Sequence, residues 1–176
     1  MSDTVSLGLV VVRVAIGTVF LAHGINHVRG RIRTTRWFAS IGFRAPGLQW
    51  LASSGTEIVA GALLIIGLGT APAAAGIIGV MTVAFWTVHR RAGFFITAFM
   101  RDGVDVEGYE YVAFLAATAL ALSIMGPGRF ALDDRITIGD TSVAVLLDGW
   151  AGAGIATLGV VAAIGLIATF WRPTST

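Results

Sequence analysis

The chain has 176 residues, of which 56% are hydrophobic and 12% charged, and its mean hydropathy is +0.83. Soluble domains are about half apolar and a quarter charged, so this composition excludes an ordinary water-soluble domain and is typical of a protein embedded in a bilayer. The formal net charge of +2 gives no reason to expect nucleic-acid binding. Cysteine is absent, which excludes disulfides, thiolate nucleophiles and cysteine-bound iron–sulfur clusters within this chain.

Apolar runs of spanning length recur along the sequence. A helix that crosses a bilayer needs about 20 mostly apolar residues. The stretch 51–88 is too long for one span, and its glycine- and proline-containing segment "GLGTAP" predicts a tight turn between two antiparallel helices. We therefore predict an all-α polytopic membrane helix bundle with five spans, at about 7–28, 51–69, 72–89, 109–125 and 143–171.

Arginine placement predicts the orientation of these spans. Five spans put the loops 29–50 and 90–108 and the C-terminus on one membrane face, and most arginines fall in these segments. Because cytoplasmic loops carry an excess of basic residues, we predict a cytoplasmic C-terminus and an N-terminus outside.

The loop 29–50 begins with a dense basic cluster. Its arginines are followed by Trp37 and Phe38, a combination that suits a short amphipathic segment at the level of the lipid headgroups. The alternative is a docking surface for an acidic or anionic partner. The residues predicted to contact headgroups or a partner are Arg29, Arg31, Arg33 and Arg36.

Ionisable residues inside the spans are the candidates for special roles, because a charge near the bilayer centre costs roughly 3 kcal/mol or more and is usually paired or functional. Arg13 lies near the outer end of the first span, and Asp133 and Asp148 belong to the same membrane face. We expect a structural ion pair between Arg13 and one of these acids, and we favour it over a substrate-binding role.

A second polar group gathers at the inner face, where His23, Glu57, His89 and Glu110 lie near the ends of four different spans. A buried carboxyl group is either neutral or paired with a cation, and His23 is the partner we expect for Glu57. Such a pair could bind the carbonyl group of a quinone or transfer a proton. It could equally be a structural hydrogen bond.

No metal site is predicted. His23 and His27 are four residues apart, but the pattern lacks the adjacent glutamate of an HExxH zinc motif. Axial ligation of a haem by His23 and His89 is a minor alternative, because two histidines at similar depth occur by chance in many membrane proteins.

Several short motifs resemble those of the DoxX family of small bacterial membrane proteins. They are "RVAIGTVFLAHGINH" at 13–27, "IGFRAP" at 41–46, "GTEIVAGALLIIGLGT" at 55–70, "VHRRAGFF" at 88–95, "YEYVAFLAATALAL" at 109–122 and "GPGRFALDD" at 126–134. The resemblance implies a four-helix membrane core at residues 1–134, with residues 135–176 adding a loop and a fifth transmembrane helix. Family members often carry lysine where this chain has His27.

The resemblance also implies a setting for function, in the bacterial inner membrane. Family members are linked to quinone reductase subunits and to oxidative-stress complexes with soluble enzymes. Two readings follow for this chain: a quinone-interacting membrane subunit of an oxidoreductase complex, with electrons supplied by a partner, or a non-catalytic anchor that recruits other proteins. Quinone is the one cofactor expected under the first reading, and the lipid bilayer and protein partners are expected under both.

Overall fold

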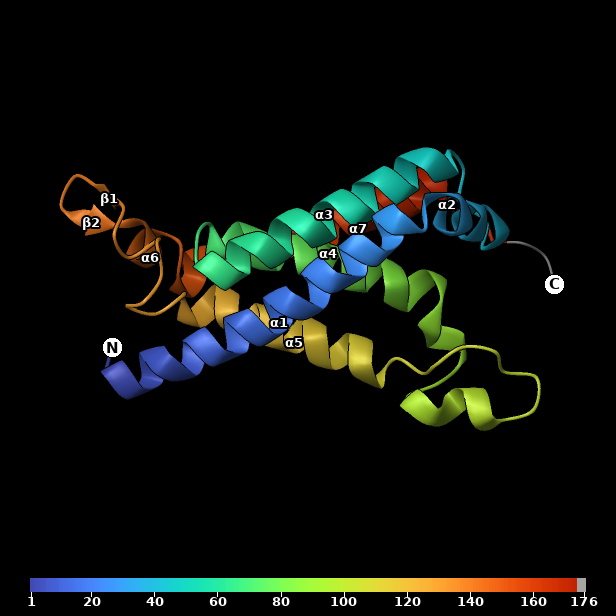
Figure 1. Ribbon diagram of the computed structural model, residues 1–176, viewed down its shortest axis with the longest axis horizontal. Helices are drawn as coiled ribbons and strands as arrows, with labels where there is room; N and C mark the ends of the chain where they lie inside the picture. Colours follow the sequence, from blue (N-terminus) through green and yellow to red (C-terminus); the bar gives the residue numbers. More distant parts are fainter. Residues whose placement is uncertain (174–176) are drawn as a thin grey trace.

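The computed structural model describes residues 1–173, and these form an elongated helical bundle (Figure 1). Its long helices are α1 (Asp3–Arg29), α3 (Pro46–Ile66), α4 (Thr70–Thr87), α5 (Glu110–Met125) and α7 (Gly149–Phe170). Four of them, α1, α3, α4 and α7, are long and apolar enough to cross a membrane, and α5 is a shorter apolar helix. The predicted all-α membrane bundle is confirmed.

Shorter elements lie at the two ends of the bundle. Helix α2 (Arg31–Ser40) follows α1, and the 3-10 turns η1 (His89–Arg91) and η2 (Ile96–Met100) lie between α4 and α5. The two-residue strands β1 (Thr137–Ile138) and β2 (Thr141–Ser142) form a small hairpin before the one-turn helix α6 (Val143–Leu146).

The C-terminal helical region differs from the single helix expected over 143–171. It is divided into α6 and α7, which are separated at Leu147 and Asp148. Gly149 has a φ of 56°, a left-handed conformation that glycine adopts without a steric penalty, and it turns the chain into α7.

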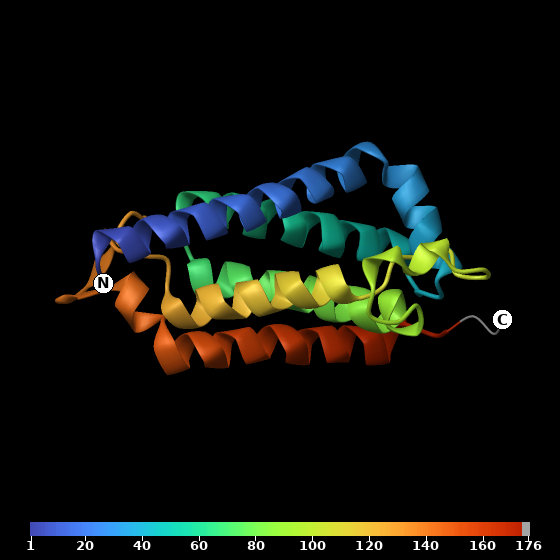
Figure 2. The ribbon, with the colours of Figure 1, turned by 90° about the horizontal axis from the view of Figure 1, so that it is seen from below.

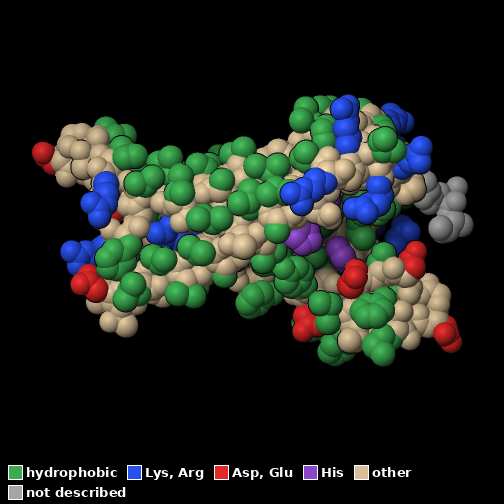
Figure 3. Space-filling view, in the orientation of Figure 1, with side chains coloured by type: hydrophobic (Ala, Val, Ile, Leu, Met, Phe, Trp, Pro, Cys, Tyr) green, Lys and Arg blue, Asp and Glu red, His purple; other side chains and the backbone are tan. Residues whose placement is uncertain are grey.

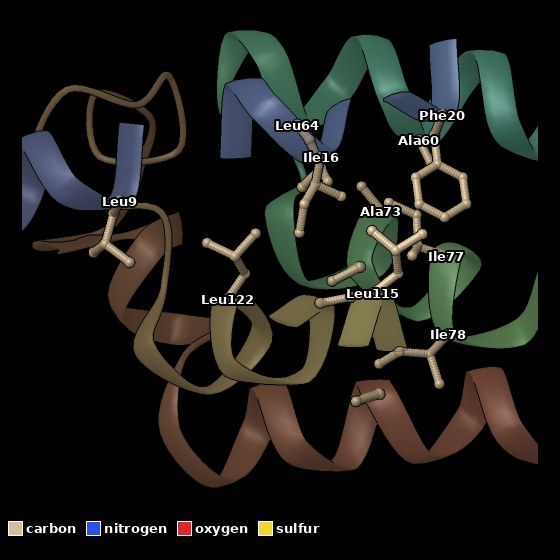
Figure 4. Packing of buried hydrophobic residues seen from close by; sticks show 13 residues of the cluster. Leu9, Ile16, Phe20, Ala60, Leu64, Ala73, Ile77, Ile78, Leu115 and Leu122 are labelled. Carbon is tan, nitrogen blue, oxygen red and sulfur yellow. The ribbon is translucent and has the colours of Figure 1, made fainter. Parts of the chain in front are cut away.

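Three layers make up the bundle (Figure 2). Helices α1 and α3 pack against each other and form the first layer. Helices α4 and α5 form the middle layer, and α7 covers the side of this layer that is opposite to α1. The buried core lies between the layers, where Ile16 and Phe20 of α1 meet Leu64 of α3, Ile77 of α4 and Leu115 of α5 (Figure 4).

Glycine residues allow the helices to approach closely. A Cβ atom built on Gly17 of α1 would lie 2.7 Å from the carbonyl oxygen of Gly61 on α3. On the other side of the bundle, Gly159 of α7 faces the backbone of Ala75 on α4. Such small-residue contacts are how membrane helices gain packing without a hydrophobic driving force between them, and they set the positions of the layers.

The two ends of the bundle differ in charge. We call the end that carries α2, residues 88–109 and the end of α7 the arginine-rich end. It holds Arg29, Arg31, Arg33, Arg36, Arg44, Arg90, Arg91, Arg101 and Arg172. The opposite end carries Arg129 and Arg135. In Figure 3 basic side chains cluster at the upper right, beyond the broad apolar middle of the molecule.

Candidate functional site

A large cavity of about 940 Å³ lies between the layers, bounded by α1 and α3 on one side and by α4, α5 and α7 on the other. Most of its lining is apolar, and its polar lining is concentrated near the arginine-rich end. The polar residues there include His23, His27, Gln49, Ser53, Glu57 and His89. Histidine side chains are visible in a notch on the face shown in Figure 3, with charged groups on both sides. Its size falls within the range typical of small-molecule sites.

Glu57 is paired with His27. The Glu57 Oε2 and His27 Nδ1 atoms are 2.9 Å apart, and the two side chains are 6% and 25% exposed. This distance is that of an ion pair, but the two atoms do not meet the geometry of a hydrogen bond. An imidazole N–H can donate and a carboxylate oxygen can accept, so the pair brings one group of each kind to the cavity wall. The hydroxyl group of Ser53 donates a hydrogen bond of 3.3 Å to Glu57 Oε1.

The backbone around this pair explains the choice of partner. Gly24 is buried in the interface between α1 and α3, and a Cβ atom there would lie 3.0 Å from the Cβ atom of Glu57. His27 follows Gly24 by three residues, so its side chain lies on nearly the same face of α1, the face that packs against α3. Trp50 Nε1 donates a 3.0 Å hydrogen bond to the carbonyl oxygen of His27, which fastens this turn of α1 to α3.

His23, the partner expected from the sequence, is not the residue that meets Glu57. Its ring lies 6.3 Å from that of His27 and it also lines the cavity. Sequence spacing places both histidines on one helix face but does not give the register of α1 against α3, and that register selects His27.

His89 is held in a defined orientation at the start of η1, two residues after the end of α4. Its Nδ1 atom is 2.8 Å from the carbonyl oxygen of Glu107. A carbonyl oxygen only accepts hydrogen bonds, so Nδ1 carries the proton in this contact and Nε2 remains as the ring atom able to exchange a proton. His89 lines the same cavity as the His27–Glu57 pair.

Glu110 has a local structural contact. Its Oε2 atom accepts a 3.0 Å hydrogen bond from the backbone N–H of Ile96, which joins the start of α5 to η2. Among residues 1–173, no group of three or more histidine, cysteine, aspartate or glutamate side chains is arranged to hold a metal ion.

Arg13 is buried at the opposite end of the bundle, with 3% of its surface exposed. The expected ion pair to Asp133 or Asp148 is not formed: its Nη1 atom donates to the carbonyl oxygens of Leu64 and Ile65, at 3.1 and 2.8 Å, and its Nη2 atom to that of Phe130 at 2.9 Å. The first two carbonyls belong to the last turn of α3, where the helix dipole is negative, and that of Leu64 also accepts a 3.2 Å hydrogen bond from the backbone N–H of Gly67.

Asp133 meets the start of a helix in the same way. Its carboxylate oxygens accept hydrogen bonds from the backbone N–H groups of Gly69, at 2.7 Å, and Thr70, at 2.9 Å. These donors begin α4, where the helix dipole favours a negative charge. Asp148 lies elsewhere, directly before α7 and beside Gly126. Arg13 and Asp133 thus each form their hydrogen bonds mainly with backbone groups at a helix end.

The basic segment predicted to contact headgroups or a partner begins at Arg29, the last residue of α1, and continues through α2. Arg31 stacks over the ring of Trp50 at 4.8 Å from its centroid. Among the described residues, Arg29, Arg33 and Arg36 form no salt bridge, so their charges face outward from the arginine-rich end.

Some of the cavity wall was not anticipated from the sequence. Gln49, only 4% exposed, and Phe38 line the cavity although neither was singled out as a site residue. The contribution of α7 was also missed. A signal for it exists in the small residues Gly152, Ala156, Gly159 and Ala163, whose spacing places them on one helix face.

Comparison with known proteins finds a family whose model matches part of this chain. The DoxX family model matches residues 8–90, the segment from α1 to η1. The chain is 27% identical over 135 residues to a Bacillus subtilis protein named "Putative oxidoreductase CatD", covering 76% of this chain and 90% of that protein. An "Uncharacterized protein" of Haemophilus influenzae is 25% identical over 138 residues, covering 74% of this chain and 83% of that protein.

No solved structure matches the chain significantly. The family match covers the helices that carry His23, His27, Glu57 and His89, and the bundle has several helices of membrane-spanning length and composition. Residues 8–90 therefore match the DoxX family model, in a chain whose long helices have the length and composition of membrane spans.

Proposed function

We propose that the chain is a quinone-binding membrane subunit of an oxidoreductase complex, with the quinone ring in the polar part of the cavity. The observation that carries this proposal is the His27–Glu57 pair on the wall of a large, mostly apolar cavity that His89 also lines. A quinone needs an apolar site for its ring and a few polar groups at its two carbonyl oxygens, which is the composition of this cavity.

The polar groups have the chemistry that quinone reduction requires. Reduction to the quinol takes two electrons and two protons. The His27–Glu57 pair would pass a proton to one carbonyl oxygen, and the His89 ring would exchange a proton through Nε2. Electrons would come from a partner enzyme, because the chain has no cysteine and no nucleotide-binding glycine motif. The name of the B. subtilis relative, an oxidoreductase, supports a redox setting.

The same reading gives an orientation in the bacterial inner membrane. The arginine-rich end would face the cytoplasm according to the positive-inside rule, which leaves the N-terminus outside. The notch that exposes the histidines would then open near the cytoplasmic headgroups (Figure 3), where protons and a soluble electron donor are available.

Replacing Glu57 with glutamine tests the proposal. The amide keeps the size of the side chain but removes the carboxylate charge that faces His27. Hydrogen bonds to charged groups contribute about 1.5–3 kcal/mol, so we expect roughly a ten-fold or larger loss of quinone affinity. The measurement is the amount of quinone extracted per protein after purification in mild detergent, followed by titration of the quinone-depleted protein.

Glu110→Gln is the matched control, because Glu110 contacts the backbone of Ile96 at η2 and does not line the cavity. It should retain the quinone content of the wild-type protein. A wild-type protein that neither carries nor binds quinone, or a Glu57→Gln protein that binds it as tightly as Glu110→Gln, would contradict the proposal.

A non-catalytic anchor is the second candidate function, and the unpaired arginines of the α2 region favour it. We expect that changing Arg29, Arg33 and Arg36 together to glutamine reduces the recovery of co-purifying proteins by about ten-fold, since exposed charge pairs contribute up to about 1 kcal/mol each. Native purification followed by mass spectrometry measures the recovery of these proteins.

The matched control changes Arg90, Arg91 and Arg172 to glutamine. This variant loses the same charge at the same end and should retain the partners. Equal losses of partners in both variants would indicate only nonspecific attraction.

A further inference from the structure

The apolar part of the cavity extends away from the polar groups as a groove. Helices α3 and α7 form its walls and α4 forms its floor. The α7 residues that line it recur at the spacing of one helix face: Ile155, Leu158, Gly159, Ala162, Ala163 and Leu166. Small or short α4 residues make the floor: Pro72, Gly76, Gly79 and Val83.

The groove is closed at the arginine-rich end. The backbone N–H of Arg44 donates a 2.8 Å hydrogen bond to Phe170, and that of Arg172 donates a 2.9 Å bond to Gly42. Trp171 Nε1 donates a 2.8 Å bond to the carbonyl oxygen of Ile41. These bonds fasten the end of α7 to the turn before α3, so the two helices are joined across the end of the groove.

The side of the groove remains open. Leu158 is 65% exposed, and Ala52 and Ala162 are also exposed although all three line the cavity. This opening lies along spans that the bilayer surrounds, so it faces acyl chains. The notch on the other side of the cavity is bordered by charged side chains (Figure 3), which an apolar chain would have to desolvate.

We infer that this groove holds the polyprenyl chain of the quinone, which enters sideways from the bilayer with its ring leading toward His27 and Glu57. The inference rests on the proposed function. Polar groups at one end of the cavity and an apolar groove leading to the lipid fit a ligand with one polar ring and one long apolar chain. From Ile155 to Leu166 the α7 wall rises about 16 Å, enough to enclose the first part of such a chain.

The inference gives α7 a specific role. Helix α7 lies outside the matched DoxX domain at residues 8–90, yet it supplies one wall of the groove. The ring site would then belong to the matched domain, and the C-terminal helix would determine how the chain of the ligand is accommodated.

Ala162→Trp tests the groove, because a large side chain at this exposed lining position fills it without entering the packed core. The probes are a long-chain prenylquinone and a quinone with the same ring and no chain, each titrated into lipid-depleted protein. We expect the affinity for the long-chain quinone to fall at least ten-fold and that for the chainless quinone to change less than two-fold. Val161→Trp is the matched control, since Val161 is 59% exposed and does not line the cavity.

The outcomes separate the groove from the ring site. If Ala162→Trp binds both quinones as the wild-type protein does, or loses both equally, the groove does not hold the chain and the proposed function is unaffected. If the wild-type protein binds neither quinone, the proposed function fails and the groove assignment with it.

Photocrosslinking gives a second measurement on the unaltered protein. A quinone that carries a photoreactive group on its chain should label peptides from residues 52–56 and 155–166. Labelling confined to α1 and α5, which border the notch, would overturn the inference even if the tryptophan variant proved unstable.

Discussion

Replacing Arg13 with methionine lowers the free energy of unfolding of the protein by about 3 kcal/mol. Methionine is apolar and of similar length, so the change removes the guanidinium group with little loss of packing. The carbonyl oxygens of Ile65 and Phe130 lose the donor that Arg13 supplies, and each unsatisfied buried acceptor costs about 1–3 kcal/mol. The loss is measured by titrating the purified protein with a denaturing detergent and monitoring its unfolding by circular dichroism.

The contacts of Arg13 explain why the loss should be global. One guanidinium group joins the middle of α1 to the last turn of α3 and to the loop that follows α5. Asp133, from that same loop, caps the start of α4. Removal of Arg13 therefore loosens three segments at once, and the loop that presents Asp133 to α4 is one of them.

Arg13→Lys separates charge from geometry. An ammonium group keeps the positive charge but cannot present the planar fork of donors that reaches carbonyls in two directions, so we expect an intermediate loss. Arg129→Gln is the control, because the Arg129–Asp3 salt bridge at this end is exposed and exposed pairs contribute little. Equal unfolding curves for Arg13→Met and Arg129→Gln would refute the structural role.

The sequence predicted the bundle because long apolar runs have few alternatives. Each run of about 20 apolar residues separated by turn residues becomes a helix in lipid, and the observed α1, α3, α4 and α5 lie within a few residues of their predicted ranges. Charge placement at the ends follows from connectivity alone. The break before α7 was missed, since it depends on a left-handed Gly149 that hydropathy does not reveal.

Side-chain partners were harder to predict. The sequence singled out Arg13 and Glu57 as ionisable groups that need partners at depth, and both have them. The partners themselves depend on features that hydropathy does not encode. Arg13 and Asp133 meet helix ends, which are backbone groups without a signature in side-chain charge, and Glu57 meets His27 because of the register between α1 and α3.

That register is set by glycine, and Gly61→Ala tests it. A Cβ atom on Gly61 would lie 2.6 Å from the carbonyl oxygen of Gly17 and 2.6 Å from the backbone nitrogen of Leu21. Backbone atoms cannot rotate away as a flexible side chain can, so α1 and α3 must separate. Overpacking of this kind costs about 1–3 kcal/mol, and we expect a loss near the upper limit, measured by the same unfolding titration.

Gly55→Ala is the matched control on the same helix. A Cβ atom there meets nothing within 4 Å, and alanine is the better helix former by about 0.8–1 kcal/mol, so this variant should be slightly more stable than the wild-type protein. The same chemical change thus has opposite expected signs at two positions of α3. Separation of α1 from α3 also moves His27 away from Glu57, so Gly61→Ala should lose bound quinone while Gly55→Ala keeps it. If the two variants were equally stable, close approach of the backbones would not be what holds α1 and α3 together.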